Sequence, residues 1–261
     1  MNRALDKENK RKRHAQISGV LAEKGAVTIS EIASRFHITP ETARKDLKEL
    51  EAAGLAVRYH GGARFQVQNE FKEGPPLQRR LCDNITKKDA LCRAALQLVR
   101  PGDSVILDSG STIYLLAQKL VNIPHIVVVT SSLPVATLMV EHNIRVMVIG
   151  GEIFEADCSV GGPWVDACLN NVNTDIAFIG ATNIRNPLGP EVENLTAGNV
   201  KHAMMQHAKK KYLLADSSKF FSSSLLAFSS WESLDGIIVD KDISPEFTDM
   251  IGSRTNIIYA E

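Results

Sequence analysis

Small and hydroxylated side chains occupy residues 108–112, which read Asp-Ser-Gly-Ser-Thr at the end of a predicted strand. An amphipathic pattern over 112–121 follows and predicts a helix. Such a turn exposes backbone N–H groups at the N-terminus of a helix, where the helix dipole favours negative charge. The run therefore indicates a phosphate site, with a plain Gly/Ser loop as the alternative that the turn alone leaves open.

Two further predicted strands end in similar residues, because Thr-Ser-Ser stands at 130–132 and Gly-Gly at 150–151. Ligands of open parallel sheets bind beyond the carboxyl ends of the strands. Three such ends in succession favour a ligand site over packing. The strand ends nominate Asp108, Gly110, Ser111, Thr112, Ser131, Ser132, Gly150 and Gly151 as ligand-binding residues.

The elements that must position these turns are short apolar runs that alternate with amphipathic stretches through residues 85–261. Alternation of strands and helices predicts an α/β domain whose mostly parallel sheet is covered on both faces. The predicted strands are 104–108, 126–130, 145–149, 175–179, 212–215, 236–239 and 256–259. Helices are predicted at 112–121, 134–142 and 197–209, and the lysines of 209–211 are expected to end the last of them, where the helix dipole favours cations.

A second group of functional side chains lies on a helix predicted to begin at Thr39. Thr39 suits the N-cap, Pro40 the first turn and Glu41 the positive end of the dipole. Leu47 and Leu50 give a buried stripe. The other side is left to Thr42, Arg44, Lys45 and Lys48. With the preceding helix, which Thr28 or Ser30 can cap, this pattern predicts a helix-turn-helix whose last helix reads DNA.

A predicted strand over 55–59 and the glycine pair at 61–62 come next and indicate a β-hairpin wing. The predicted DNA contacts are Thr39, Glu41, Thr42, Arg44, Lys45 and Lys48 on the helix, and Arg58, His60 and Gly61 on the wing. Residues 1–64 hold 13 Lys and Arg against 8 Asp and Glu, whereas the remainder holds 17 against 22. The cations alone could be a solvated helix face, but together with the turn, the wing and this charge asymmetry they favour a DNA reader joined to a regulatory body.

The run ISEIASRFHITPETARKDLKELEAAGLAVRYHGGA at 29–63 resembles the DNA-binding domain of the DeoR family of sugar-catabolism repressors. Three later runs, TDIAFIGA, LGPEVENLTAGNVKHAMM and LLADSSKF, resemble that family's sensor domain, which is related to the ribose-5-phosphate isomerase and glucosamine-6-phosphate deaminase folds. The resemblance implies a phosphorylated sugar effector that releases the protein from its operator. It places Asp108, Gly110, Ser111 and Thr112 around the phosphate and Lys219 at the pocket.

The expected organisation is a winged helix-turn-helix at 1–64, a linker at 65–84 and an effector-sensing and oligomerisation domain at 85–261. The linker is indicated by its polar composition and by the Gly-Pro-Pro run at 74–76, which cannot lie inside a helix. One winged helix-turn-helix contacts few base pairs, so a homodimer or homotetramer is expected on double-stranded operator DNA.

Several classes of protein are not expected. No apolar run approaches the ~18 residues of a membrane span, and residues 1–16 lack the apolar segment of a signal peptide. The four cysteines form no CxxC pair, and the histidines form no cluster with metal spacing. We therefore expect a cytoplasmic protein with no membrane partner, no metal and no cofactor.

Two alternatives to a repressor remain at this point. A sugar-phosphate isomerase or deaminase needs a general base, and Asp108, Glu193 and Asp216 are available. The sequence contains no compact pair of acids, however, and a DNA-reading domain has no purpose in a pure enzyme. A transcriptional activator would use the same parts as a repressor, because the sign of regulation depends on where the operator lies.

Overall fold

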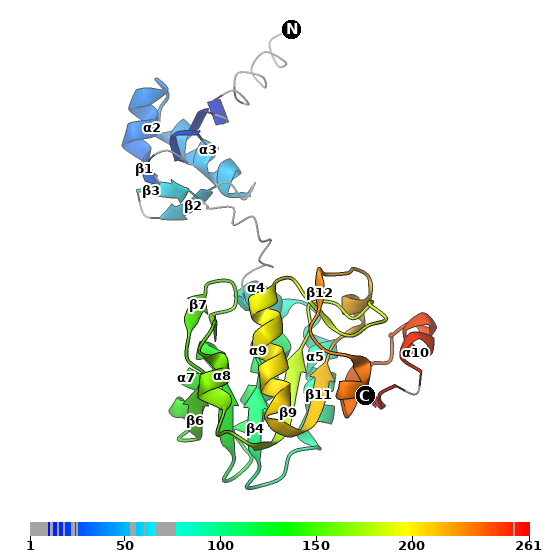
Figure 1. Ribbon diagram of the computed structural model, residues 1–261. Coiled ribbons are helices and arrows are strands. Elements are labelled where there is room, and N and C mark those ends of the chain that lie inside the picture. The colour runs from blue at the N-terminus through cyan, green and yellow to red at the C-terminus, as the bar shows by residue number, and fades with distance from the viewer. Residues whose placement is uncertain are drawn as a thin grey trace. The chain divides into compact units, whose positions relative to one another are not determined.

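The computed structural model describes residues 10, 13–14, 16–17, 19–21, 24, 26–52, 56–59, 61–65, 77–252 and 254–261. Contacts divide the chain into two compact units, Met1–Lys72 and Glu73–Glu261, which are described separately (Figure 1). In the described part of the chain, no helix combines the length and the apolar character needed to cross a membrane.

The first unit combines helices with a small antiparallel sheet. Described residues between 10 and 24 are helical, and α2 (Ile29–Arg35) and α3 (Pro40–Ala52) follow. The sheet has the order β1-β3-β2, built from β1 (Ala26–Thr28), β2 (Ala56–Tyr59) and β3 (Gly62–Phe65). The core includes the buried side chains of Ile17, Leu21, Ile32, Leu47 and Leu50. The predicted helix-turn-helix with a hairpin wing is confirmed. Strand β1 was not predicted, because its three residues are too few to show a strand pattern in the sequence.

Both helices of the motif begin at a threonine. The Thr28 hydroxyl accepts a hydrogen bond from the Glu31 N–H at 3.2 Å, and the Glu31 carboxylate accepts one from the Thr28 N–H at 2.7 Å. This reciprocal capping box selects Thr28 from the two caps that the sequence allowed. Thr39 caps α3 in a similar way, because its hydroxyl accepts from the Thr42 N–H at 3.2 Å.

The second unit is built on a seven-stranded sheet with the order β14-β13-β11-β9-β4-β5-β6. Every pair in it is parallel. Its strands are β4 (Ser104–Leu107), β5 (Val127–Thr130), β6 (Arg145–Val148), β9 (Thr174–Gly180), β11 (Ala208–Leu214), β13 (Gly236–Asp240) and β14 (Ile257–Ala260). The predicted parallel α/β sheet is thus confirmed, and each predicted strand overlaps one strand of the sheet.

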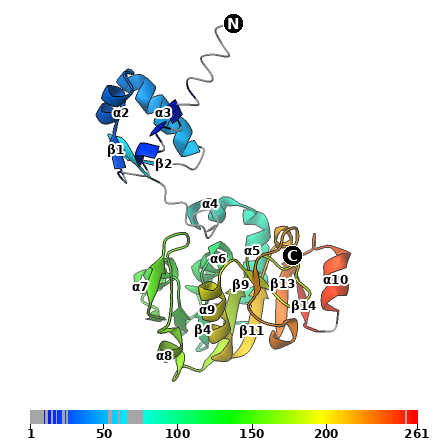
Figure 2. The ribbon, with the colours of Figure 1, turned by 45° about the horizontal axis from the view of Figure 1, so that its top comes forward.

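Helices cover both faces of this sheet and give it two separate cores (Figures 1 and 2). One core contains α5 (Ile85–Leu96), α6 (Ser111–Leu120) and α7 (Leu133–Glu141). The other contains α8 (Val165–Leu169), α9 (Leu195–Gln206) and α10 (Pro245–Ile251). Strands β4 and β9 are neighbours, but the helices that next cover the sheet after them, α6 and α9, lie on opposite faces.

Smaller elements lie at the periphery of the second unit. Two antiparallel pairs are β7 (Glu152–Phe154) with β8 (Ser159–Gly161), and β10 (Glu191–Val192) with β12 (Leu226–Ala227). Two 3-10 turns are η1 (Ser217–Phe220) and η2 (Trp231–Ser233).

Two local expectations differ from the structure. The lysines of 209–211 do not end a helix but lie in β11, because α9 already ends at Gln206 and the chain pairs with β9 from Ala208 onward. Lys209 there forms an ion pair with Asp175 at 2.8 Å.

The second difference concerns the segment expected to be a linker, whose residues 77–82 form helix α4 (Leu77–Cys82). This helix belongs to the second unit, where Leu77 is buried and α4 contacts α6. The Gly-Pro-Pro run at 74–76 lies outside the described residues.

Candidate functional site

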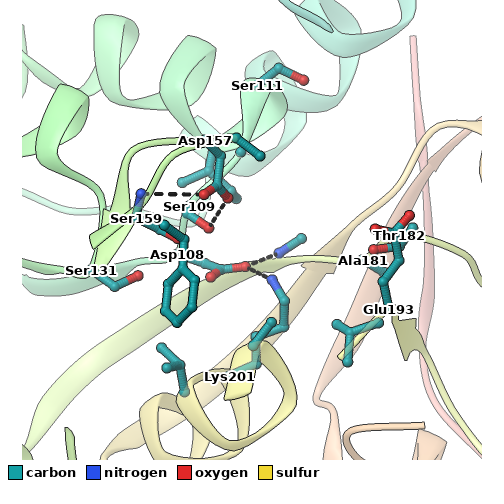
Figure 3. A pocket seen from close by; sticks show the side chains of 18 of the residues that line it. Asp108, Ser109, Ser111, Ser131, Asp157, Ser159, Ala181, Thr182, Glu193 and Lys201 are labelled. Atoms are coloured by element: carbon teal, nitrogen blue, oxygen red, sulfur yellow. Dashed lines mark hydrogen bonds and ion pairs between the residues drawn. The ribbon is translucent and has the colours of Figure 1, made fainter. Parts of the chain in front are cut away.

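A cavity of about 230 Å³ lies at the carboxyl ends of the central strands of the second unit. Asp108 and Ser131 line it just after the ends of β4 and β5 (Figure 3). Gly180, the last residue of β9, lines it as well. It therefore lies at the edge of the sheet where the sequence predicts a ligand. Of the nominated residues, the structure brings Asp108, Gly110, Ser111, Thr112, Ser131 and Lys219 to this cavity.

A buried ion pair joins Asp108 to Lys201 in the wall of the cavity (Figure 3). Asp108 is 1% exposed and Lys201 is 8% exposed. The same carboxylate oxygen of Asp108 also accepts a hydrogen bond from the Gly180 N–H at 2.9 Å. Because removal of either charge would leave the other buried without a counter-charge, this pair is a fixed part of the wall. Asp108 is therefore a structural residue of the wall, because one of its carboxylate oxygens is already bound by Lys201 and by the Gly180 N–H.

The turn at 109–113 presents the N-terminus of α6 to the cavity. Gly110 is the N-cap, with a φ of 107° that favours glycine. The backbone N–H groups of the first helical turn have no partner within a helix. The turn thus presents N–H donors and the positive end of the α6 dipole to the cavity, as the sequence predicts for a phosphate site.

Two basic side chains that approach the cavity from other elements are Arg80 of α4 and Lys219 of η1. Burial lowers the pKa of Lys219, and the nearby Asp216 carboxylate opposes that shift. The Nε atom of Arg80 is buried and, among the described residues, has no hydrogen-bond partner. The same is true of the Ser131 hydroxyl. Buried polar atoms without partners are rare in folded proteins, so these two suit a ligand that completes their hydrogen bonds.

Three nominated residues lie outside the cavity lining. Ser132 is the N-cap of α7, where its hydroxyl accepts from the Val135 N–H. Gly150 and Gly151 lead into β7, and a Cβ atom at Gly151 would lie 2.1 Å from the Gly161 carbonyl oxygen. Chain geometry accounts for the small residues at Ser132 and Gly151.

Sequence reasoning did not nominate Arg80 or Lys201 as site residues. Lys201 lies inside a quoted motif, but its partner is 93 positions away. Arg80 was hidden by the polar composition of the expected linker. In the described part of the chain, no group of three or more His, Cys, Asp or Glu side chains could hold a metal ion.

In the first unit, α3 presents the side chains that the sequence placed on its outer side. Arg44, Lys45 and Lys48 are exposed and Thr42 is half-buried. Arg44 forms an ion pair with Glu41 at 2.7 Å. Gly61 has a φ of 96° in the hairpin turn. His60 and the side chain of Arg58 lie outside the described part of the structure.

The inner side of α3 carries a buried carboxylate, Asp46, which is 1% exposed. Arg13 donates two hydrogen bonds to it, at 2.7 and 3.1 Å, and His14 lies 2.9 Å away. Burial alone would raise the pKa of Asp46, but the hydrogen bonds from Arg13 and His14 lower it below its ordinary value. This cluster ties the first helical segment to α3 and so fixes which side of α3 faces outward.

Two protein families match successive parts of the chain. The DeoR-like helix-turn-helix domain matches residues 13–69, and the DeoR C-terminal sensor domain matches residues 83–241. Together they cover both units described above.

Curated relatives match over most of their length. The lactose phosphotransferase system repressor of Lactococcus lactis subsp. lactis is 30% identical over 97% of this chain and 100% of the relative. The putative aga operon transcriptional repressor of Escherichia coli O157:H7 is 29% identical over 88% of this chain and 86% of its own.

Among solved structures, a D-ribose-5-phosphate isomerase in complex with phospho-erythronic acid overlaps 51% of this chain and 52% of its own. The TM-score is 0.39 and the sequence identity is 21%. This overlap is partial, and the assignment rests instead on the two family matches and the full-length relatives. The chain belongs to the DeoR family of DNA-binding transcriptional repressors.

Proposed function

We propose that this chain represses a carbohydrate-utilisation operon and leaves its operator when a phosphorylated sugar binds the cavity of the second unit. The observation that carries the ligand class is the convergence of the α6 N-terminus with Arg80 and Lys219 around one cavity. The relatives named above, which are repressors of a lactose phosphotransferase system and an aga operon, support the carbohydrate part of the proposal.

The phosphate is proposed to lie against the turn at 109–113, where N–H groups that have no partner within the helix and the helix dipole favour a dianion. The unpartnered Nε of Arg80 is a charge-assisted donor for the same group. A dianion near Lys219 would also supply the counter-charge that its burial calls for.

The sugar hydroxyls would meet polar side chains on the remaining walls. Ser131 offers a buried hydroxyl without a partner among the described residues, and Thr182, Glu193 and Asn194 also line the cavity. Hydroxyl-bearing ligands therefore fit these walls better than apolar ones.

DNA binding is proposed to use the exposed side of α3 together with the wing. Arg44, Lys45 and Lys48 would supply the positive charge that phosphates of the duplex require. Since one such unit reads few base pairs, we propose that the second unit holds two or four copies together on repeated half-sites.

A thermal-shift screen of the full chain against matched phosphorylated and free sugars tests the ligand class. We expect stabilisation by phosphorylated sugars only, and loss of it in Ser111→Asp, which places a negative charge at the α6 N-terminus. Ser223→Asp is the matched control, because Ser223 is exposed and lies outside the cavity lining. Hits confined to free sugars would contradict the proposal, and turnover of a sugar phosphate would favour the isomerase alternative.

Each hit is then added to the complex of the full chain with DNA selected from a random pool. We expect a phosphorylated hit to weaken that complex, and a ligand that leaves it unchanged would not be the inducer.

A further inference from the structure

The β7–β8 hairpin forms one wall of the cavity in the second unit. Residues 155–158 connect its two strands. The hairpin residues that line the cavity are Phe154, Ala156, Asp157, Ser159 and Val160. This wall therefore lies where a ligand in the cavity can contact it.

The hairpin connection is attached to the first residue of α4. The Leu77 N–H donates a hydrogen bond to the Ala156 carbonyl oxygen at 3.0 Å. Helix α4 is the first described element of the second unit, and in the sequence it follows the segment 66–76 that leads from the DNA-binding unit. A movement of the connection therefore reaches the first described helix of the second unit.

The same connection is attached to the proposed phosphate turn. The Ser109 hydroxyl donates a hydrogen bond to one Asp157 carboxylate oxygen at 2.8 Å, and the other oxygen accepts from the Ser159 N–H at 3.2 Å (Figure 3). Ser109 directly precedes Gly110, the N-cap of α6. A negative charge of the protein therefore lies beside the N–H groups that are proposed to hold a phosphate.

The second strand of the hairpin and Cys158, the last residue of the connection, are held independently of these contacts. The Val160 N–H donates to the Ser131 carbonyl at 2.7 Å, and the Leu133 N–H donates to the Cys158 carbonyl at 3.0 Å. These bonds join the hairpin to the end of β5 and the start of α7. The connection can therefore shift at its 155–157 side while the hairpin stays attached to the sheet.

We propose that Asp157 is the residue that detects the phosphate and passes its presence to α4. This inference rests on the proposed function, because it takes the turn at 109–113 as the phosphate site. A phosphate there repels the Asp157 carboxylate and competes for the Ser109 hydroxyl. Asp157 moves away, the connection moves with it, and the hydrogen bond between Leu77 and Ala156 weakens. A neutral sugar of similar shape leaves Asp157 in place, so it binds without acting as an inducer.

The ligand-free protein provides the first test, by hydrogen–deuterium exchange of peptides that cover residues 77–82. Asp157→Ala removes the acceptor of the Ser109 hydroxyl, so we expect about three- to tenfold faster exchange there, the range for loss of one hydrogen bond. Glu155→Ala is the matched control, since Glu155 is an exposed acid of the same connection outside the cavity lining. Equal exchange in Asp157→Ala and wild type would overturn the role of Asp157 in holding α4.

The second test adds inorganic phosphate, and then the best sugar phosphate of the screen, to the wild type and to Asp157→Asn. Asparagine lacks the charge and keeps one acceptor oxygen, which can serve the Ser109 hydroxyl, while the bond from the Ser159 N–H is lost. We expect phosphate to bind Asp157→Asn about tenfold more tightly than wild type, because a like charge is gone. Phosphate should speed exchange at 77–82 in wild type and in the control Glu155→Gln, but much less in Asp157→Asn.

The outcomes separate this inference from the proposed function. Phosphate that binds wild type without changing exchange at 77–82 contradicts the inference and leaves the ligand site standing. Failure of every phosphate to bind contradicts the ligand site, and the ligand-free comparison still decides whether Asp157 holds the connection to α4.

Discussion

Each unit of this protein buries a carboxylate against basic side chains, but the two carboxylates have different surroundings. Asp46 lies among packed helices and is bound by Arg13 and His14. Asp108 lies in the wall of an open cavity, bound by Lys201 and the Gly180 N–H. In the first unit the buried acid fixes the orientation of α3, whose cations lie on its opposite, exposed side. In the second it supplies the counter-charge of a lysine in the wall of the cavity.

This comparison shows that a buried ion pair does not by itself mark a functional site. What distinguishes the second unit is the presence of unpartnered polar atoms beside the pair, the Arg80 Nε and the Ser131 hydroxyl among the described residues. Buried pairs stabilise a fold only when both partners are present, whereas unpartnered atoms at a cavity indicate what a ligand must supply.

The largest effect is expected for Lys201→Met, which keeps most of the volume and removes the counter-charge of Asp108. Loss of one partner from so buried a pair costs about 3–5 kcal/mol. Denaturant unfolding of the full chain should show this loss in the transition of the second unit. The double variant Asp108→Asn with Lys201→Met is the control, and it should recover part of the loss; an equal or larger loss in the double variant would show that the pair is not the cause.

A somewhat smaller effect is expected for Asp46→Ala, since Arg13 and His14 retain some access to water after the loss of their partner. Hydrogen bonds to a charged group suggest about 2–3 kcal/mol. The loss should appear in the unfolding of the first unit and not of the second. Glu41→Ala is the control, because Glu41 is an exposed acid on the same helix. A stable Asp46→Ala protein would refute the tie between α3 and the first helical segment.

DNA binding should respond to the exposed side of α3 without any change in stability. Arg44→Ala should cost about 1–3 kcal/mol of operator binding and relax specificity if Arg44 contacts a base. Lys45→Ala should weaken binding to all DNA sequences alike. It should also reduce, by about one unit, the slope of the logarithm of the binding constant against the logarithm of the salt concentration. Lys24→Ala, an exposed lysine outside α3, is the control for charge alone. Normal operator binding by the Arg44/Lys45 double variant would remove α3 from the interface.

The smallest effect is expected from pH. The folded pKa of Asp46 is lowered, so its contribution to stability is complete above the unfolded value of about 3.9 and is lost as the pH falls through the folded pKa. Between about pH 5 and pH 2, the free energy of unfolding of the first unit should therefore fall more steeply with decreasing pH in wild type than in Asp46→Asn. If the free energy of unfolding changes with pH equally in the two proteins, Asp46 does not contribute this dependence.

The fold was readable from the sequence because its signals are local. The alternation of apolar runs marks the strands of the large sheet, and Thr39, Pro40 and Glu41 mark the start of α3. The site was readable only in part. The turn after β4 is predicted by its small and hydroxylated residues. The pairing of Asp108 with Lys201 could not be predicted, because it depends on how distant segments of the chain pack together. Arg80 lies in a short polar helix whose burial is decided by tertiary contacts of Leu77.

The helices that follow the neighbouring strands β4 and β9 cover opposite faces of the sheet. This arrangement affects how the protein can evolve. The cavity beside these strands is lined in part by segments within 108–113, 154–160, 180–182 and 192–194, which come from separate parts of the chain. None of these segments supplies most of either core. Outside the buried pair of Asp108 and the core residues Ile113 and Val192, a substitution in one of these segments can alter which ligand is accepted while the sheet and its helices keep their packing.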